Sequence, residues 1–75
     1  MKSMRKIGNY CKFLANEKNI TIETIAENLC YSTEKIEDFF IGNFILPFWK
    51  LEALAYMLNV SVSQILDATE DETYI

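Results

Sequence analysis

The chain contains no histidine, and its 75 residues include only two cysteines, two glycines and one proline. The absence of histidine excludes imidazole general bases and histidine-containing zinc sites. A glycine-rich phosphate loop and a suitable pair of catalytic carboxylates are missing as well, so we expect no enzyme, no metal and no cofactor. The scarcity of glycine and proline argues against a turn-rich β-sandwich or barrel.

Long hydrophobic runs are also missing. No stretch approaches the roughly 18 apolar residues that a membrane-spanning helix requires, and no secretory signal precedes the cysteines. We therefore expect a cytoplasmic protein without membrane contact. In that compartment Cys11 and Cys30 are expected to stay reduced and to pack as small hydrophobic side chains.

Apolar residues make up 51% of the chain and ten residues are aromatic, which is enough for one small folded domain. The net charge of −4 is unevenly distributed. Residues 1–18 hold five basic residues and one acid, whereas residues 19–75 hold two lysines and ten acids. A basic first segment on an acidic body is unusual for a protein that binds a polyanion.

Apolar residues recur at helical spacing, which predicts an all-α, compact five-helix domain over residues 1–66. Asn19 is expected to end the first helix, Thr21 and Ser32 to begin the next two, and Gly42 to end the third. Pro47 and Asn59 bound the fourth helix, and Ser61 opens the fifth through a capping box with Gln64. The apolar residues expected in the core are Met4, Ile7, Cys11, Leu14, Ile25, Ala26, Leu29, Ile36, Phe39, Leu51, Leu54, Ala55, Leu58 and Ile65, with Leu66 as a further candidate. Residues 67–75 are predicted to form a frayed, acidic C-terminal tail.

With the helices placed in this way, residues 7–66 resemble the Cro/lambda-repressor (XRE-type) family of helix-turn-helix domains. The resemblance rests on the order Thr21, Ile25-Ala26-Glu27-Asn28-Leu29, Ser32, Ile36, Gly42, Pro47, Leu54-Ala55, Leu58-Asn59-Val60-Ser61 and Ile65-Leu66. It implies a helix-turn-helix motif at about residues 21–42, whose second helix lies in the major groove of double-stranded DNA. The DNA-binding residues that it implies are Thr33, Glu34, Lys35 and Asp38 for bases and Ser32, Asn43 and Lys50 for phosphates.

The sequence departs from the family pattern at several of these places. Ile22 stands where a phosphate-binding glutamine is frequent, and Ala15 where a basic residue is frequent. Cys30 replaces the usual glycine of the turn, and a left-handed conformation there is expected to cost roughly 1 kcal/mol. Residues 33–38 hold three acids and one lysine, although one glutamate in such a helix can accept a hydrogen bond from cytosine.

A second departure is the apolar segment 39–49, in which eight of eleven residues are large and hydrophobic. We expect Phe39 and either Phe48 or Trp49 to be buried in the core. The remainder is too large for a small domain to bury, and exposed apolar patches mark protein partners. The protein interface predicted from this segment consists of Phe40, Ile41, Phe44, Ile45 and Trp49.

Two functions therefore stand open at the level of sequence. The first is a small transcriptional regulator that binds operator DNA as a homodimer. The second is a helix-turn-helix fold that serves as a protein-interaction module, as an antirepressor or a pairing subunit with little affinity for DNA. The family resemblance places the DNA-binding regulator narrowly first, and the acidic third helix and the apolar segment make the interaction module the alternative.

Overall fold

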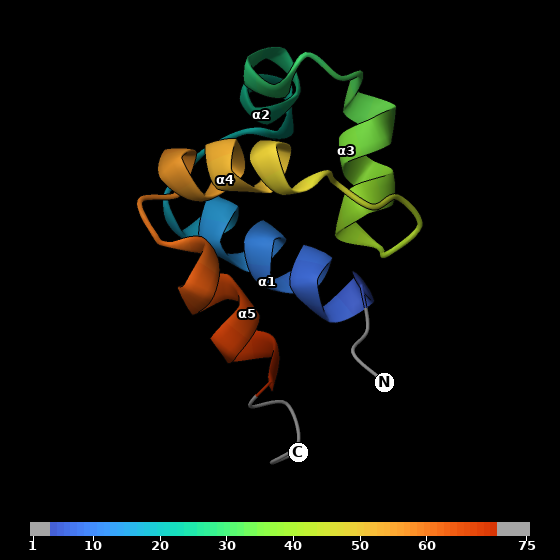
Figure 1. The fold of residues 1–75 in the computed structure, drawn as a ribbon. Helices are drawn as coiled ribbons and strands as arrows, with labels where there is room; N and C mark the ends of the chain where they lie inside the picture. Colours follow the sequence, from blue (N-terminus) through green and yellow to red (C-terminus); the bar gives the residue numbers. More distant parts are fainter. Residues whose placement is uncertain (1–3, 71–75) are drawn as a thin grey trace.

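The computed structural model describes residues 4–70, which form five helices connected by short loops. These are α1 (Met4–Glu17), α2 (Ile22–Leu29), α3 (Thr33–Phe40), α4 (Phe48–Met57) and α5 (Val62–Glu70). No strand occurs in this part of the chain, so the predicted all-α, five-helix class is confirmed. Helix α1 packs against α3 and α5, α2 against α3 and α4, and α4 against α5 (Figure 1).

Side-chain caps begin three of the helices at the predicted residues. The hydroxyl oxygens of Thr21, Ser32 and Ser61 accept hydrogen bonds from backbone N–H groups three residues later, at 3.2, 3.2 and 3.0 Å. Each bond satisfies a donor in the first helical turn that has no partner within the helix. Helix α4 instead begins directly after Pro47, whose carbonyl accepts from the backbone N–H groups of Lys50 and Leu51.

Left-handed residues end the helices. The backbone φ angles are 58° at Asn19, 63° at Cys30, 90° at Gly42 and 62° at Asn59. Cys30 thus adopts the left-handed conformation whose cost was considered above, and the backbone N–H groups of Cys30 and Tyr31 bond to the last turn of α2. This conformation is unfavourable for a residue that has a Cβ atom.

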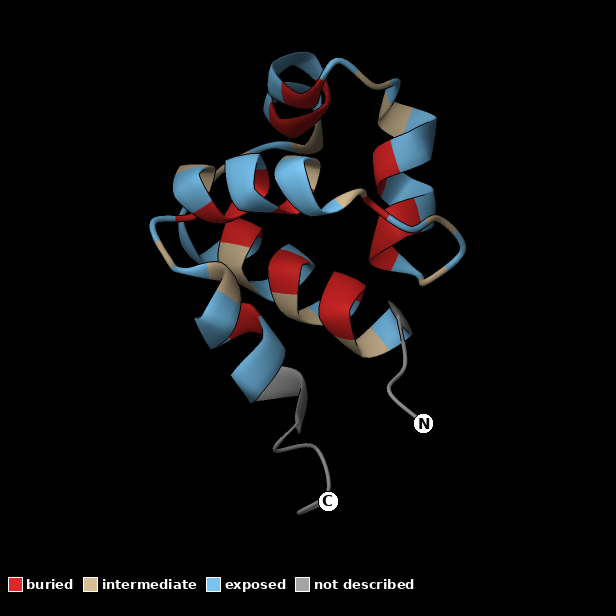
Figure 2. Ribbon diagram, in the orientation of Figure 1, coloured by how far each residue is buried: buried red, intermediate tan, exposed pale blue. Residues whose placement is uncertain are grey.

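The core lies where the inner faces of the five helices meet (Figure 2). Of the core residues assigned from helical spacing, every one whose side chain is described is buried, apart from half-buried Leu14 and the exposed candidate Leu66. The side chain of Met4 lies outside the described residues. Three further side chains join this core, namely Ala15, Phe40 and Leu46.

Three expectations about burial were wrong. Phe40 is buried, because it shares the inner side of α3 with Ile36 and Phe39 at spacings of four and one. Phe48 and Trp49 are both exposed, because Leu46 fills the core at this end of α4. Cys30 is exposed, because the left-handed turn directs it away from the core.

The predicted tail was also placed too early, because α5 continues as a helix to Glu70. The rest of that tail, residues 71–75, lies outside the described residues. No helix within residues 4–70 combines the length and the apolar character needed to cross a membrane.

Helices α1 and α3 cross very closely at Gly8. A Cβ atom on Gly8 would lie 2.1 Å from the carbonyl oxygen of Phe39 and 2.7 Å from that of Phe40. Both are backbone atoms, so no side-chain rotation can relieve the overlap. Only glycine permits this crossing, which positions the C-terminal end of α3 and the connector that follows it.

Candidate interaction surface

The outward side of α3 carries most of the residues implied by the family resemblance. Glu34, Lys35 and Asp38 are exposed, and Thr33 at the start of the helix is partly buried. Ser32 precedes them as the N-cap, so its hydroxyl already accepts a hydrogen bond from the backbone of Lys35. The exposed charges of α3 are therefore one lysine and three acids, the third acid being Glu37.

Lys50 makes a contact within its own chain. Its ammonium Nζ donates a hydrogen bond of 2.6 Å to the carbonyl oxygen of Leu29, the last residue of α2. Carbonyl groups at a helix C-terminus have no partner within the helix and carry the negative end of its dipole, so an ammonium group there stabilises the helix end. The structure thus uses Lys50 to hold α4 to the end of α2.

The rings of Tyr31 and Phe44 lie in a row between the ammonium groups of Lys50 and Lys35. The Lys50 Nζ atom lies 5.2 Å from the ring centroid of Tyr31, and the Lys35 Nζ atom lies 4.7 Å from that of Phe44. The rings of Tyr31 and Phe44 meet edge to face at 5.3 Å between centroids. This row, from Lys50 through Tyr31 and Phe44 to Lys35, ties the α2–α3 turn to the residues before α4, and both ammonium groups face rings of their own chain.

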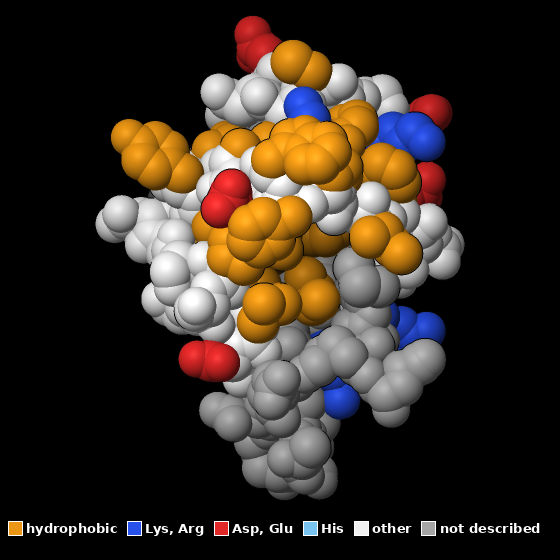
Figure 3. Space-filling model, viewed as in Figure 1, with side chains coloured by type: hydrophobic (Ala, Val, Ile, Leu, Met, Phe, Trp, Pro, Cys, Tyr) orange, Lys and Arg blue, Asp and Glu red, His pale blue; other side chains and the backbone are white. Residues whose placement is uncertain are grey.

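The residues between α3 and the first turn of α4 expose four large hydrophobic side chains. We call Ile41, Ile45, Phe48 and Trp49 the connector surface; their side chains are 54%, 66%, 60% and 68% exposed. Phe44, which was predicted to belong to it, is half-buried against Tyr31. Figure 3 shows hydrophobic side chains gathered over α4 and the connector, and they continue toward α5. A patch of this size usually marks a binding site.

The exposed hydrophobic area extends along α4 to Tyr56, which is 86% exposed. The sequence analysis missed this residue because it lies outside the segment 39–49. Helical spacing could have identified it, because Tyr56 follows Trp49 by seven residues, or about two turns. Both residues lie on the side of α4 opposite the buried Leu51, Leu54 and Ala55.

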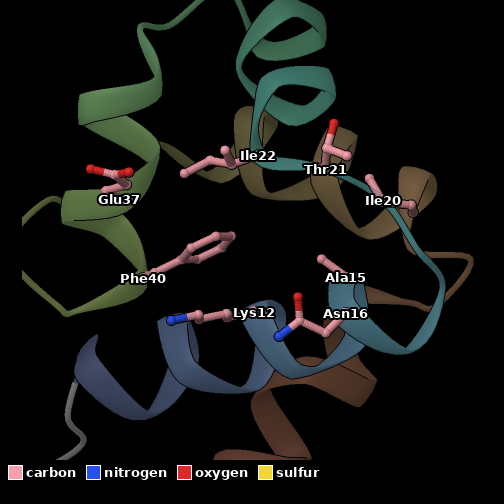
Figure 4. Close-up of a pocket in the computed structure, with 8 residues that line it drawn as sticks. All are labelled: Lys12, Ala15, Asn16, Ile20, Thr21, Ile22, Glu37 and Phe40. Atoms are coloured by element: carbon pink, nitrogen blue, oxygen red, sulfur yellow. The ribbon is translucent and has the colours of Figure 1, made fainter.

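A groove lies between α1 and α3. Phe40 points from α3 into the space that α1 and the start of α2 surround, so it contributes to the floor of the groove (Figure 4). Lys12 and Asn16 of α1 and Glu37 of α3 provide its polar residues. Ala15 and Ile22, two of the positions that differ from the family pattern, supply apolar lining. This arrangement explains why Phe40 belongs to the interior of the fold.

The two thiols lie in contrasting environments. Cys11 is buried, and loss of solvation raises its pKa from 9.0 to about 12. A thiol with a pKa this high stays protonated at neutral pH and is a poor nucleophile. Among the described residues, no three cysteine or acidic side chains are grouped in a way that suits a metal ion.

Comparisons with protein-family models, with curated proteins and with solved structures give no match for this chain.

Proposed function

We propose that this domain is a protein-interaction module that binds its partner through the connector surface, and that it has little affinity for DNA. The observation that carries the proposal is the exposure of Ile41, Ile45, Phe48 and Trp49 beside a helix whose outward charges are mainly acidic. Large apolar and aromatic side chains are enriched at the centres of protein interfaces, where their burial provides much of the binding energy.

The electrostatics of the same region support this choice over DNA. Nucleic-acid affinity depends heavily on lysine and arginine side chains that neutralise phosphates and release counterions. Two of the lysines implied in DNA binding already have partners in their own chain, since Lys50 donates to Leu29 and Lys35 of α3 lies over Phe44. Glu34 and Asp38 add negative charge to the side of α3 that would approach the phosphates, and Glu37 adds a further negative charge on the flank that faces α1.

The interaction function is tested by site-specific photo-crosslinking in cells that express the full chain. A photo-reactive amino acid at position 45 is expected to give a discrete covalent product with a protein partner or with a second copy. Phe13 is the matched control position, because it is 55% exposed on α1 and does not belong to the connector surface. The proposal is refuted if position 45 gives no protein product, or only the products that position 13 also gives.

A second function, a homodimeric DNA-binding regulator, is favoured by the capped α2–turn–α3 arrangement. The N-cap Ser32 directly precedes α3, and Glu34 and Asp38 are exposed along the outward side of the helix. In the family that the sequence resembles, this arrangement recognises DNA, and the N-terminal residues of the helix contact the bases.

Light scattering after size exclusion, with and without a random-sequence duplex at low salt, separates the two functions. The interaction module is expected to elute unchanged when the duplex is added. A complex with the duplex that Lys35→Ala weakens, and that dissociates steeply as salt rises, would favour the DNA-binding regulator instead.

A further inference from the structure

The outward side of α4 carries an almost symmetrical row of uncharged side chains. Trp49, Ala53 and Tyr56 occupy positions i, i+4 and i+7, which share one side of a helix. All three are exposed, with Trp49 at 68% and Tyr56 at 86%. We call these three residues the α4 stripe. It places a small residue between two large aromatic ones, four positions from the first and three from the second.

We propose that the α4 stripe binds the α4 stripe of a second copy of this chain, as an antiparallel helix pair that crosses at Ala53. In a two-fold dimer the same patch serves on both subunits, so the patch must be complementary to itself. An antiparallel crossing at Ala53 places Trp49 beside Tyr56 of the partner subunit, and the reverse contact follows by symmetry. The methyl group of Ala53 permits the close approach of the two helices that such a crossing needs.

The exposed aromatic area agrees with a dimer of modest stability. An aromatic side chain has about 150–250 Å² to bury, so the exposed parts of Phe48, Trp49 and Tyr56 offer roughly 400–450 Å² per chain. Ile45 and the adjoining backbone bring this toward about 600 Å² per chain, which corresponds to the lower limit of standard interfaces. An interface near this limit is typical of weak, transient association, so we expect monomers and dimers in exchange.

The charges on α4 distinguish a second copy from other partners. The only acidic residue of the helix is Glu52, and the ammonium group of Lys50 is occupied by Leu29. An antiparallel crossing at Ala53 brings the two Glu52 side chains to the same edge of the interface, where they repel each other. This repulsion predicts opposite outcomes for different partners, because Glu52→Gln strengthens a dimer of this chain but weakens a complex with a basic partner protein.

The inference rests on the proposed interaction function and specifies the partner. Its test is light scattering of the full chain from low to high micromolar concentration. The wild-type chain is expected to pass from the mass of one chain to that of two. Ala53→Arg is expected to remain monomeric at all of these concentrations, because a large charged side chain at the crossing point prevents contact. Asn16→Arg is the matched control, since it adds the same charge at an exposed position of α1, and it is expected to dimerise as the wild-type chain does.

Glu52→Gln provides an independent measurement, because it is expected to lower the dissociation constant several-fold and to make dimerisation less dependent on salt. A wild-type chain that stays monomeric throughout, or a dimer that Ala53→Arg leaves intact, overturns the inference. In either case a crosslinked product from position 45 still supports the interaction function with a different partner or geometry. If position 45 also fails to give a product, the proposed function fails with it.

Discussion

Replacement of Gly8 by alanine tests the closest packing contact of the fold. The added Cβ atom would lie 2.1 Å from the Phe39 carbonyl oxygen and 2.7 Å from that of Phe40. Because the Phe39 carbonyl also accepts a hydrogen bond from the Gly42 N–H group at 3.1 Å, a shift of the α3 end disturbs the connector as well. Helices α1 and α3 must therefore move apart by more than an ångström at this point, or the chain must distort.

Two opposing effects determine the size of the change. Alanine is favoured over glycine within a helix by about 1 kcal/mol. Overpacking of a well-filled core costs about 1–3 kcal/mol, and the overlap with two rigid backbone atoms places Gly8→Ala at the upper end. The expected net result is a loss of about 2 kcal/mol in the free energy of unfolding, because the overlap outweighs the gain in helix propensity. For a domain of this size that loss lowers the melting temperature by roughly 8–16 °C.

The assay is thermal and urea unfolding followed by circular dichroism, with Asn9→Ala as the matched control. Asn9 is the exposed neighbour of Gly8 in α1, so its replacement tests helix propensity away from the crossing. Asn9→Ala is expected to leave stability unchanged or slightly raised. If Gly8→Ala stabilises the domain as much as Asn9→Ala does, the close crossing of α1 and α3 is refuted.

Three further predictions concern single side chains. Cys30→Gly is expected to raise the free energy of unfolding by about 1 kcal/mol, because it relieves the left-handed strain of an exposed residue; a lower urea midpoint would contradict this. Lys50→Met is expected to destabilise the domain by about 1–2 kcal/mol in urea unfolding, because the Leu29 carbonyl loses its charged donor; unchanged stability would show that the contact is unimportant. The pKa of Cys11 is raised by burial from 9.0 to about 12, so its stabilising contribution is complete below pH 9 and is lost as the pH rises through 12. As the pH rises from 8 to 11, the free energy of unfolding of the wild-type chain should therefore fall relative to that of Cys11→Val. A difference between the two chains that stays constant with pH would refute the raised pKa.

The helix boundaries were predictable because capping is local. Thr21, Ser32 and Ser61 bond to backbone groups only three residues away, and the left-handed residues Asn19 and Gly42 end helices through their own backbone preferences. Such interactions depend on a few neighbouring residues, so the sequence alone contains them. The buried faces of α2, α4 and α5 followed from helical spacing for the same reason.

The candidate site was predicted less well, because the connector has no helical period. Spacing alone did not indicate that Leu46 is buried while Phe48 and Trp49 are exposed. Phe40 was assigned to the surface as part of an apolar run, although its spacing from Ile36 already placed both on one side of α3. Tyr56 was not predicted because it lies outside the apolar run that ends at residue 49.

The sequence by itself determined the all-α class, the position of each cap and the apolar face of most helices, since these depend on interactions within a few turns. The tertiary structure alone decided which hydrophobic side chains remain exposed and where the lysines point. The bond from Lys50 to Leu29 joins residues 21 positions apart, and the crossing at Gly8 depends on carbonyl groups of α3. Contacts of this kind form only after the helices have packed, because their partner groups are far apart in the sequence and no local pattern brings them together.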